Sequence, residues 1–208
     1  MNKNMLKSKL YILVLFIIFQ SCKNETKVIE EQLIKCVNKS TNFAEYNPIG
    51  KGDFYTMIKE IEDLFISNKK LNDSSKKSYQ DMIKNVLSDE KNDKTFYDNI
   101  NKIYDKYGYI PSVNNYLVFN DCPFQVLVTE KHDIKSTLFY QSQALSGIQA
   151  DGYRDINLIK ELISLTSEND FTKIVYRAPI LLVCVSSLDN IYGKAHAPVE
   201  NFDFSKSK

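Results

Sequence analysis

The chain has 208 residues, which is enough for one sizeable domain, and its apolar content of 43% is normal for a globular protein. Its formal net charge is +1, and lysines and acidic residues are interspersed along it. This balance argues against a nucleic-acid partner, which needs clustered basic charge, and equally against a strongly acidic substrate.

The first 21 residues have the three parts of a secretory signal peptide. A lysine-bearing head without acids comes first, an apolar body over 10–19 follows, and Ser21 precedes Cys22. The apolar body is too short to span a bilayer, which takes about 20 residues. We therefore expect residues 1–21 to be a signal peptide, with an uncleaved anchor helix as the alternative.

The stretch Phe-Gln-Ser-Cys over 19–22 resembles the lipobox of bacterial lipoproteins, in the looser form typical of Bacteroidetes-like bacteria. It departs from the common pattern at Phe19, where leucine is usual. The resemblance covers the first two dozen residues only. It implies that the chain is cut before Cys22, that this cysteine is acylated, and that 22–27 form a short lipidated tether.

An acylated Cys22 has consequences for location and partners. Two or more acyl chains attach a protein stably to a membrane without a transmembrane helix. The resemblance thus implies a lipid-anchored protein of the outer membrane, on its periplasmic face or at the cell surface. The expected partners are the membrane, reached through the anchor, and another envelope protein.

The first half of the mature chain is expected to be a run of short amphipathic helices. In four stretches, apolar residues recur three and four positions apart in a charged background. These stretches begin near residues 28, 54, 79 and 96, and a loop over 41–53 separates the first two. The expected helix caps and breakers are Asn72-Asp73-Ser74, Asn92-Asp93, Gly108 and Pro111.

The segment 116–129 has two interpretations. As a hairpin, it forms two strands around a turn at Asn120-Asp121-Cys122-Pro123. As a helix, it begins near Asp121 and holds Pro123 in its first turn, where the missing N–H costs nothing. The sequence does not decide between them.

The last part of the chain is expected to form further helices over 135–148 and 156–163. The segment 172–186 is rich in β-branched residues, which favours a buried strand, yet Phe171, Ile174 and Ala178 keep helical spacing. We expect a helix there, with a kink or break at Pro179.

The predicted fold is therefore mainly α, an irregular bundle of about seven or eight short helices in a single domain over 28–193. A loose polar tail is expected over 194–208. The alternative is an α+β fold with a small sheet formed by 116–129 and 172–186.

The sequence has four cysteines, and acylation of Cys22 would leave three, so at least one of these is unpaired. Cys184 lies in an apolar run and is expected to be buried. Cys36 and Cys122 are free to pair, but their spacing does not show whether they do. Because cysteine and histidine do not occur at metal-ligand spacing, we expect neither a metal site nor a cofactor.

The sequence has two histidines, His132 and His196, and neither stands in a recognisable motif with a nucleophile. The nucleophile-elbow, phosphate-binding-loop and zinc-metalloprotease motifs are also missing from the sequence. Paired acids at Glu60, Glu62 and Asp63 are interpreted as a solvated helix face. We therefore predict no catalytic residues.

Four residues are candidates for binding. Tyr107, Tyr109 and Tyr116 fall near an expected loop, where tyrosines can line a groove for a sugar or a peptide. Arg177 is one of two arginines and lies among apolar residues. A buried guanidinium needs a carboxylate, so we expect an acid from another helix beside it and favour a structural role.

Three hypotheses for the function follow. The first is a non-catalytic protein-interaction module, either an accessory of an envelope machine or an immunity-type factor, which predicts an exposed apolar patch. The second is a lipoprotein that binds a sugar or a peptide, which requires an open aromatic groove. The third is a hydrolase, which requires a cleft that brings His132 beside acids or serines.

Overall fold

A computed structural model describes residues 27–41, 53–86, 94–129 and 136–192. Within these ranges the chain forms nine helices when the continuous stretch 111–129 is counted as one, eight of them at least seven residues long, and no strand. The mainly α prediction is confirmed, and the alternative with a small sheet is wrong. The expected signal peptide, Cys22 and the polar tail over 194–208 lie outside the described residues.

The helices follow one another with short connections. The first covers 27–41 and so begins at the last residue of the expected tether. The others are α2 (Phe54–Ser67), α3 (Lys76–Val86), α4 (Lys94–Tyr107), α5 (Pro111–Tyr116), the π-helical turn η1 (Leu117–Asp121), α6 (Cys122–Thr129), α7 (Thr137–Ala150), α8 (Ile156–Leu165), α9 (Glu168–Phe171) and α10 (Ile174–Tyr192).

Several helix ends have the polar residues and glycines that their positions require. The Ser75 hydroxyl accepts the Ser78 N–H at the start of α3, next to the expected cap, and the Asp155 carboxylate accepts the Asn157 N–H at the start of α8. Gly108 ends α4 in the left-handed region, with φ of 64°. The expected cap at 92–93 lies outside the described ranges.

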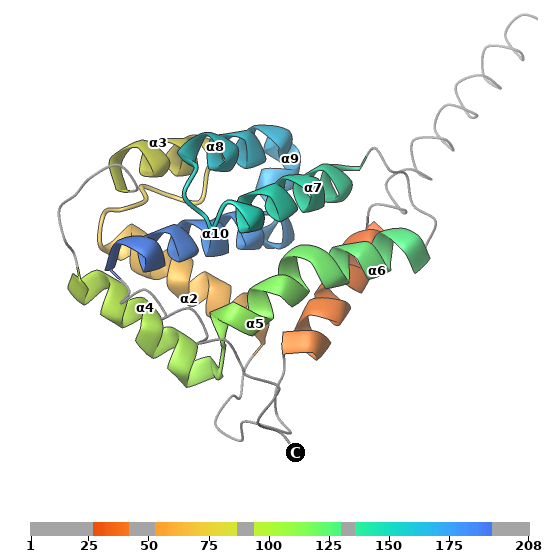
Figure 1. Ribbon diagram of the computed structural model, residues 1–208, viewed down its shortest axis with the longest axis horizontal. Helices are drawn as coiled ribbons and strands as arrows, with labels where there is room; N and C mark the ends of the chain where they lie inside the picture. Colours follow the sequence, from red (N-terminus) through yellow and green to blue (C-terminus); the bar gives the residue numbers. More distant parts are fainter. Residues whose placement is uncertain (1–26, 42–52, 87–93, 130–135, 193–208) are drawn as a thin grey trace, which may run out of the picture.

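Helix α10 lies at the centre of the bundle and packs against α2, α4, α7, α8 and α9 (Figure 1). It is long and apolar enough to cross a membrane, but 72% of that apolar window is buried inside the protein. Its composition is therefore that of a helix enclosed by other helices, which needs apolar residues on every side.

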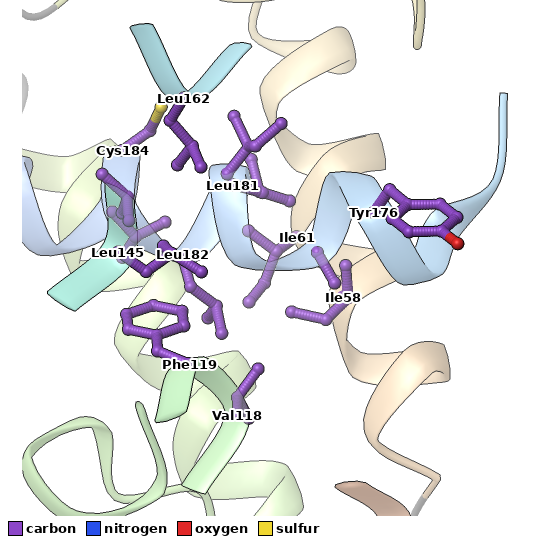
Figure 2. Close-up of a cluster of buried hydrophobic side chains, with 14 of the residues drawn as sticks. Ile58, Ile61, Val118, Phe119, Leu145, Leu162, Tyr176, Leu181, Leu182 and Cys184 are labelled. Carbon is purple, nitrogen blue, oxygen red and sulfur yellow. The ribbon is translucent and has the colours of Figure 1, made fainter. Parts of the chain in front are cut away.

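The core gathers around α10, and Figure 2 shows which helices supply it. Ile58 and Ile61 come from α2, Phe119 from η1, and Leu145 and Leu162 from α7 and α8. All five side chains are at most 2% exposed. Burying side chains of this size stabilises the fold by about 1.5–3 kcal/mol each.

Residues 111–129 form one continuous helical rod rather than a hairpin (Figure 1). The expected helical start near Asp121 is also wrong, because the rod begins at Pro111. In a regular α-helix the ring of Pro123 would collide with the carbonyl of Phe119. The π-helical turn η1 widens the rod just before this proline, and the Cys122 N–H bonds to the Leu117 carbonyl.

Of the kink or break expected at Pro179, the break is wrong. The helix runs without interruption from Ile174 to Tyr192. One turn before the proline, the Gln141 side chain of α7 donates to the Tyr176 carbonyl over 3.2 Å. The carbonyl that loses its helical donor to Pro179 is that of Val175, so this bond lies beside the gap and does not fill it. The residues on both sides of Pro179 are buried.

Cys36 and Cys122 form a disulfide, with a Cα–Cα distance of 5.6 Å, which joins the helix over 27–41 to the start of α6. The bond closes a loop with a sequence separation of 86. In the chain-entropy model such a loop stabilises the fold by about 4–5 kcal/mol. Cys184 is free and fully buried, as expected, and burial raises the pKa of its thiol to about 12.

Candidate functional site

The structure separates the three tyrosines that the sequence groups near one loop. Tyr109 is 6% exposed, and its hydroxyl donates to the Asn115 Oδ1 over 2.7 Å. Burial raises the pKa of Tyr109 well above 10.0. Tyr107 is half-buried at the edge of α4, and its hydroxyl donates to Glu60. Of the three, only Tyr116 is strongly exposed, at 60%.

Arg177 lies in the first turn of α10 and has the carboxylate partner that the sequence predicts. Its Nε donates to Glu62 Oε1 over 2.9 Å, and its Nη2 donates to Oε2 over 3.3 Å. Its Nη1 donates to the carbonyls of Phe171 and Thr172. The guanidinium is thus engaged by α2 and by the end of α9, which supports a structural role.

Glu62 corrects the interpretation of the acids on α2. The residue is 1% exposed and faces the interior, whereas Glu60 and Asp63 on either side are at the surface. Besides Arg177, it accepts a hydrogen bond from the Tyr79 hydroxyl of α3 over 2.8 Å. Three helices therefore meet at one buried carboxylate.

The pKa of Glu62 is determined by its burial and by its hydrogen-bond partners. Burial by itself raises the pKa of the Glu62 carboxyl. The hydrogen bonds from Arg177 and Tyr79 and the charge of Arg177 outweigh burial and hold the pKa below 4.5. The pair is therefore charged at neutral pH, and each partner depends on the other for compensation.

A surface groove lies between the α5–η1–α6 rod and α7, and it is the candidate site. Its volume is about 250 Å³, and it is open to solvent. Tyr116 and Phe124, which are 60% and 64% exposed, stand along the rod side of this groove. Its other lining residues are polar, namely Asn120, Asp121, Ser142, Gln143 and Ser146.

The π-helical turn determines which side chains the rod presents to the groove. Tyr116 precedes the turn, Asn120 and Asp121 belong to it, and Phe124 follows it. One extra residue in the turn lets two consecutive polar side chains line the groove between the two aromatic ones. Turns of this type are frequent at functional sites.

Hydrogen bonds fix the polar side chains that line the groove. Asn120 donates to Gln149 and accepts from the Ser146 hydroxyl over 2.7 Å. Ser142 donates to the Phe139 carbonyl over 2.8 Å, and the Asp121 carboxylate accepts from Gln125 over 2.9 Å. Gln143 is exposed and makes no hydrogen bond with the described residues. The groove is thus pre-organised except at one amide.

Two other cavities among the described residues are less suited to a ligand. A gap in the core between Leu33, Val118 and Leu145 measures about 10 Å³, the lower limit for a single water. A second surface groove of about 210 Å³ runs beside the disulfide and has no aromatic lining residue. Within the described ranges, no group of three or more histidine, cysteine or acidic residues is placed to hold a metal.

The sequence identifies one residue of the groove, Tyr116, and misses the others. Phe124 lies next to Pro123 in the segment 116–129, which the sequence allows to be a hairpin or a helix. The side chain of Phe124 is exposed only because this segment is a helix. Of the polar lining residues, Asn120 and Asp121 belong to η1, and the three from α7 have no distinguishing pattern. The groove becomes visible only when η1 and α6 pack against α7. His132 and Cys22 lie outside the described residues.

We expect Arg177→Met to lower the free energy of unfolding by about 3–5 kcal/mol, because it removes the buried charge partner of Glu62 and leaves only the exposed Lys59, 3.6 Å away. Arg177→Lys should cost less, since it keeps the charge but loses the two-pronged contact. Chemical denaturation measures both. Arg154→Met, at the exposed second arginine, is the control and should stay within about 0.5 kcal/mol. Wild-type stability of Arg177→Met would contradict the structural role.

A second prediction concerns the loss of stability at acidic pH. Because the pKa of Glu62 is lower in the folded protein than its ordinary 4.5, its contribution to stability is complete above that value and is lost as the pH falls below it. The free energy of unfolding should thus fall more steeply below about pH 4.5 in the wild type than in Glu62→Gln. Glu60→Gln, at the surface, should keep most of the wild-type slope. Equal slopes for the wild type and Glu62→Gln would refute the argument.

Comparison with protein-family models, with curated proteins and with solved structures finds no match to this chain. The groove and the buried network must therefore be interpreted from their own geometry.

Proposed function

We propose that the chain is a lipid-anchored, non-catalytic binding protein of the bacterial envelope, whose binding site is the groove between the α5–η1–α6 rod and α7. The observation that carries this proposal is the exposure of Tyr116 and Phe124, at 60% and 64%, along a polar groove. Side chains of this size usually bury most of their surface. Their exposure on a pre-organised surface is typical of a binding site.

The proposed location rests on the N-terminal sequence and on the disulfide. The basic head, the short apolar body and Cys22 resemble a lipoprotein signal. The Cys36–Cys122 bond favours an oxidising compartment, since disulfides persist outside the cytosol and are rare within it. Both features are consistent with a protein that works outside the cytoplasmic membrane.

Contact with another envelope protein is the second candidate function. It is favoured by Phe124 and Val128, which lie one turn apart on α6 and are 64% and 58% exposed. Such a row of apolar side chains fits the apolar core of a protein interface as well as a ligand groove. An accessory role and an immunity-type role both belong to this candidate.

The anchor is tested by Cys22→Ala. The wild-type protein should incorporate a fatty-acid analogue and stay with the membrane fraction, because its acyl chains hold it there. Cys22→Ala should lose the label and remain uncut or become soluble. Cys184→Ala is the matched control, because it removes an unpaired cysteine outside the lipobox and should keep the label. Label that persists on Cys22→Ala would show that the lipobox is misread.

The groove is tested by a photoreactive benzoylphenylalanine at position 143, introduced into the full chain in its own envelope. Gln143 is exposed and lines the groove, so a bound component should be captured there. The control position is Lys160, which is exposed on α8. We expect an adduct at 143 that is missing at 160 and that disappears in Tyr116→Ala/Phe124→Ala. The same adducts at both positions, or none, would contradict a binding function of this groove.

A further inference from the structure

We infer that the groove binds one ring of a neutral oligosaccharide, held against Tyr116 and Phe124 and hydrogen-bonded to the polar residues between the rod and α7. This inference rests on the proposed function and names the class of ligand. Four properties of the groove lead to it: its size, its charge, its hydrogen-bonding capacity and its helical walls.

Size limits the ligand to a part of a longer chain. Sites that enclose a whole small molecule measure about 300–1,000 Å³ and bury most of the ligand. This groove is smaller, about 250 Å³, and is open. It therefore suits a single ring whose neighbours project into solvent at both ends, as the units of an oligosaccharide do.

Charge argues against an anionic ligand. Among the described residues that line the groove, the only ionisable group apart from the tyrosine hydroxyl is the Asp121 carboxyl, and none is cationic. A phosphate, a sulfate or an acidic sugar would meet a like charge without compensation. The remaining lining groups are neutral amides, hydroxyls and aromatic rings.

The hydrogen-bonding groups of the groove favour a ligand that carries donors. The hydroxyl protons of Ser142 and Ser146 are donated within the protein, to the Phe139 carbonyl and to Asn120. Their oxygens, together with the Asp121 carboxylate, still have capacity to accept. Gln143 can both donate and accept. The hydroxyl groups of a sugar match this set, because each can donate to an oxygen and accept from an amide.

The aromatic side chains supply the other half of the recognition. A pyranose ring has a face of C–H groups and a rim of hydroxyls. The C–H face packs on the electron-rich face of an aromatic ring, while the rim reaches the polar groups beside it. Tyr116 and Phe124 stand on either side of Asn120 and Asp121 along the rod, so both kinds of contact lie next to each other.

The helical walls argue against an extended peptide. A peptide that binds by main-chain pairing needs the free edge of a sheet. Both walls of this groove are helices, and their main-chain groups are used within them. Recognition must come from side chains, as it does for a sugar. A proline-rich or a lysine-bearing peptide, which aromatic grooves also accept, is the competing occupant.

The test measures binding by calorimetry with the full mature chain, acylated and held in a detergent without a sugar headgroup. The probes are hexasaccharides of glucose, mannose and N-acetylglucosamine, a proline-rich peptide and a lysine-rich peptide. We expect a hexasaccharide to bind and neither peptide to do so. Tyr116→Ala and Phe124→Ala should each raise its Kd about tenfold, and Gln143→Ala about threefold.

Tyr140→Ala is the matched control, because Tyr140 is an exposed aromatic residue on α7, the other wall, and does not line the groove. Its Kd should equal that of the wild type. Because Tyr116 and Phe124 are exposed, their truncation should leave the fold intact, and equal melting temperatures verify this. The inference is overturned if no hexasaccharide binds, if binding survives Tyr116→Ala/Phe124→Ala, or if a peptide binds in the groove instead. If a peptide binds in the groove instead, the proposed binding function still stands. That function is contradicted if the photoreactive residue at position 143 captures nothing.

Discussion

The ion pair between Arg177 and Glu62 constrains how the helices of this protein pack, because neither charge can remain buried alone. It joins the first turn of the central helix to α2, and the Tyr79 hydroxyl extends the contact to α3. A slip of any of these helices by one turn would leave a guanidinium or a carboxylate in apolar surroundings. The apolar side chains supply most of the driving force for folding. The ion pair restricts them to one arrangement among the many that apolar contacts alone would allow.

The helices with one apolar face are predictable from the sequence, as 54–67 and 156–165 show, because their apolar residues recur with the helical period. Helix α10 lacks this signal, since it is enclosed on all sides and apolar all round, and its β-branched residues and Pro179 are equally typical of a buried strand. The rod over 111–129 is ambiguous for a related reason. Pro123 argues against a helix that continues through it, and only the π-helical turn before it makes that helix acceptable. The packing that resolves both cases involves residues far away in the sequence.

The residues of the buried pair and of the groove differ in how far the sequence reveals them. Arg177 stands out among apolar neighbours, and its need for an acid follows directly. Glu62 is obscured by the charged residues beside it, although it lies four positions after Ile58 and three before Phe65, on the apolar face of α2. Tyr116 shares its signal with Tyr109, and only the hydrogen bond to Asn115 shows that Tyr109 belongs to the interior. The polar groups of α7 have no signal at all.

If Cys22 carries a lipid anchor, the disulfide also limits how far the groove can stand from the membrane. Along the chain, about a hundred residues separate Cys22 from the groove, but Cys36 is joined directly to Cys122, inside the rod that forms one wall. From Cys22 to residue 27 the chain spans at most about 18 Å, and the helix from 27 to 36 adds about 14 Å. An anchor at Cys22 would therefore be a short tether that keeps the groove within a few tens of ångströms of the lipid surface. A partner would have to come to the membrane to be bound, and tension on the anchor would reach the Glu30–Lys173 ion pair, at the start of α10, before it reached the disulfide and α6.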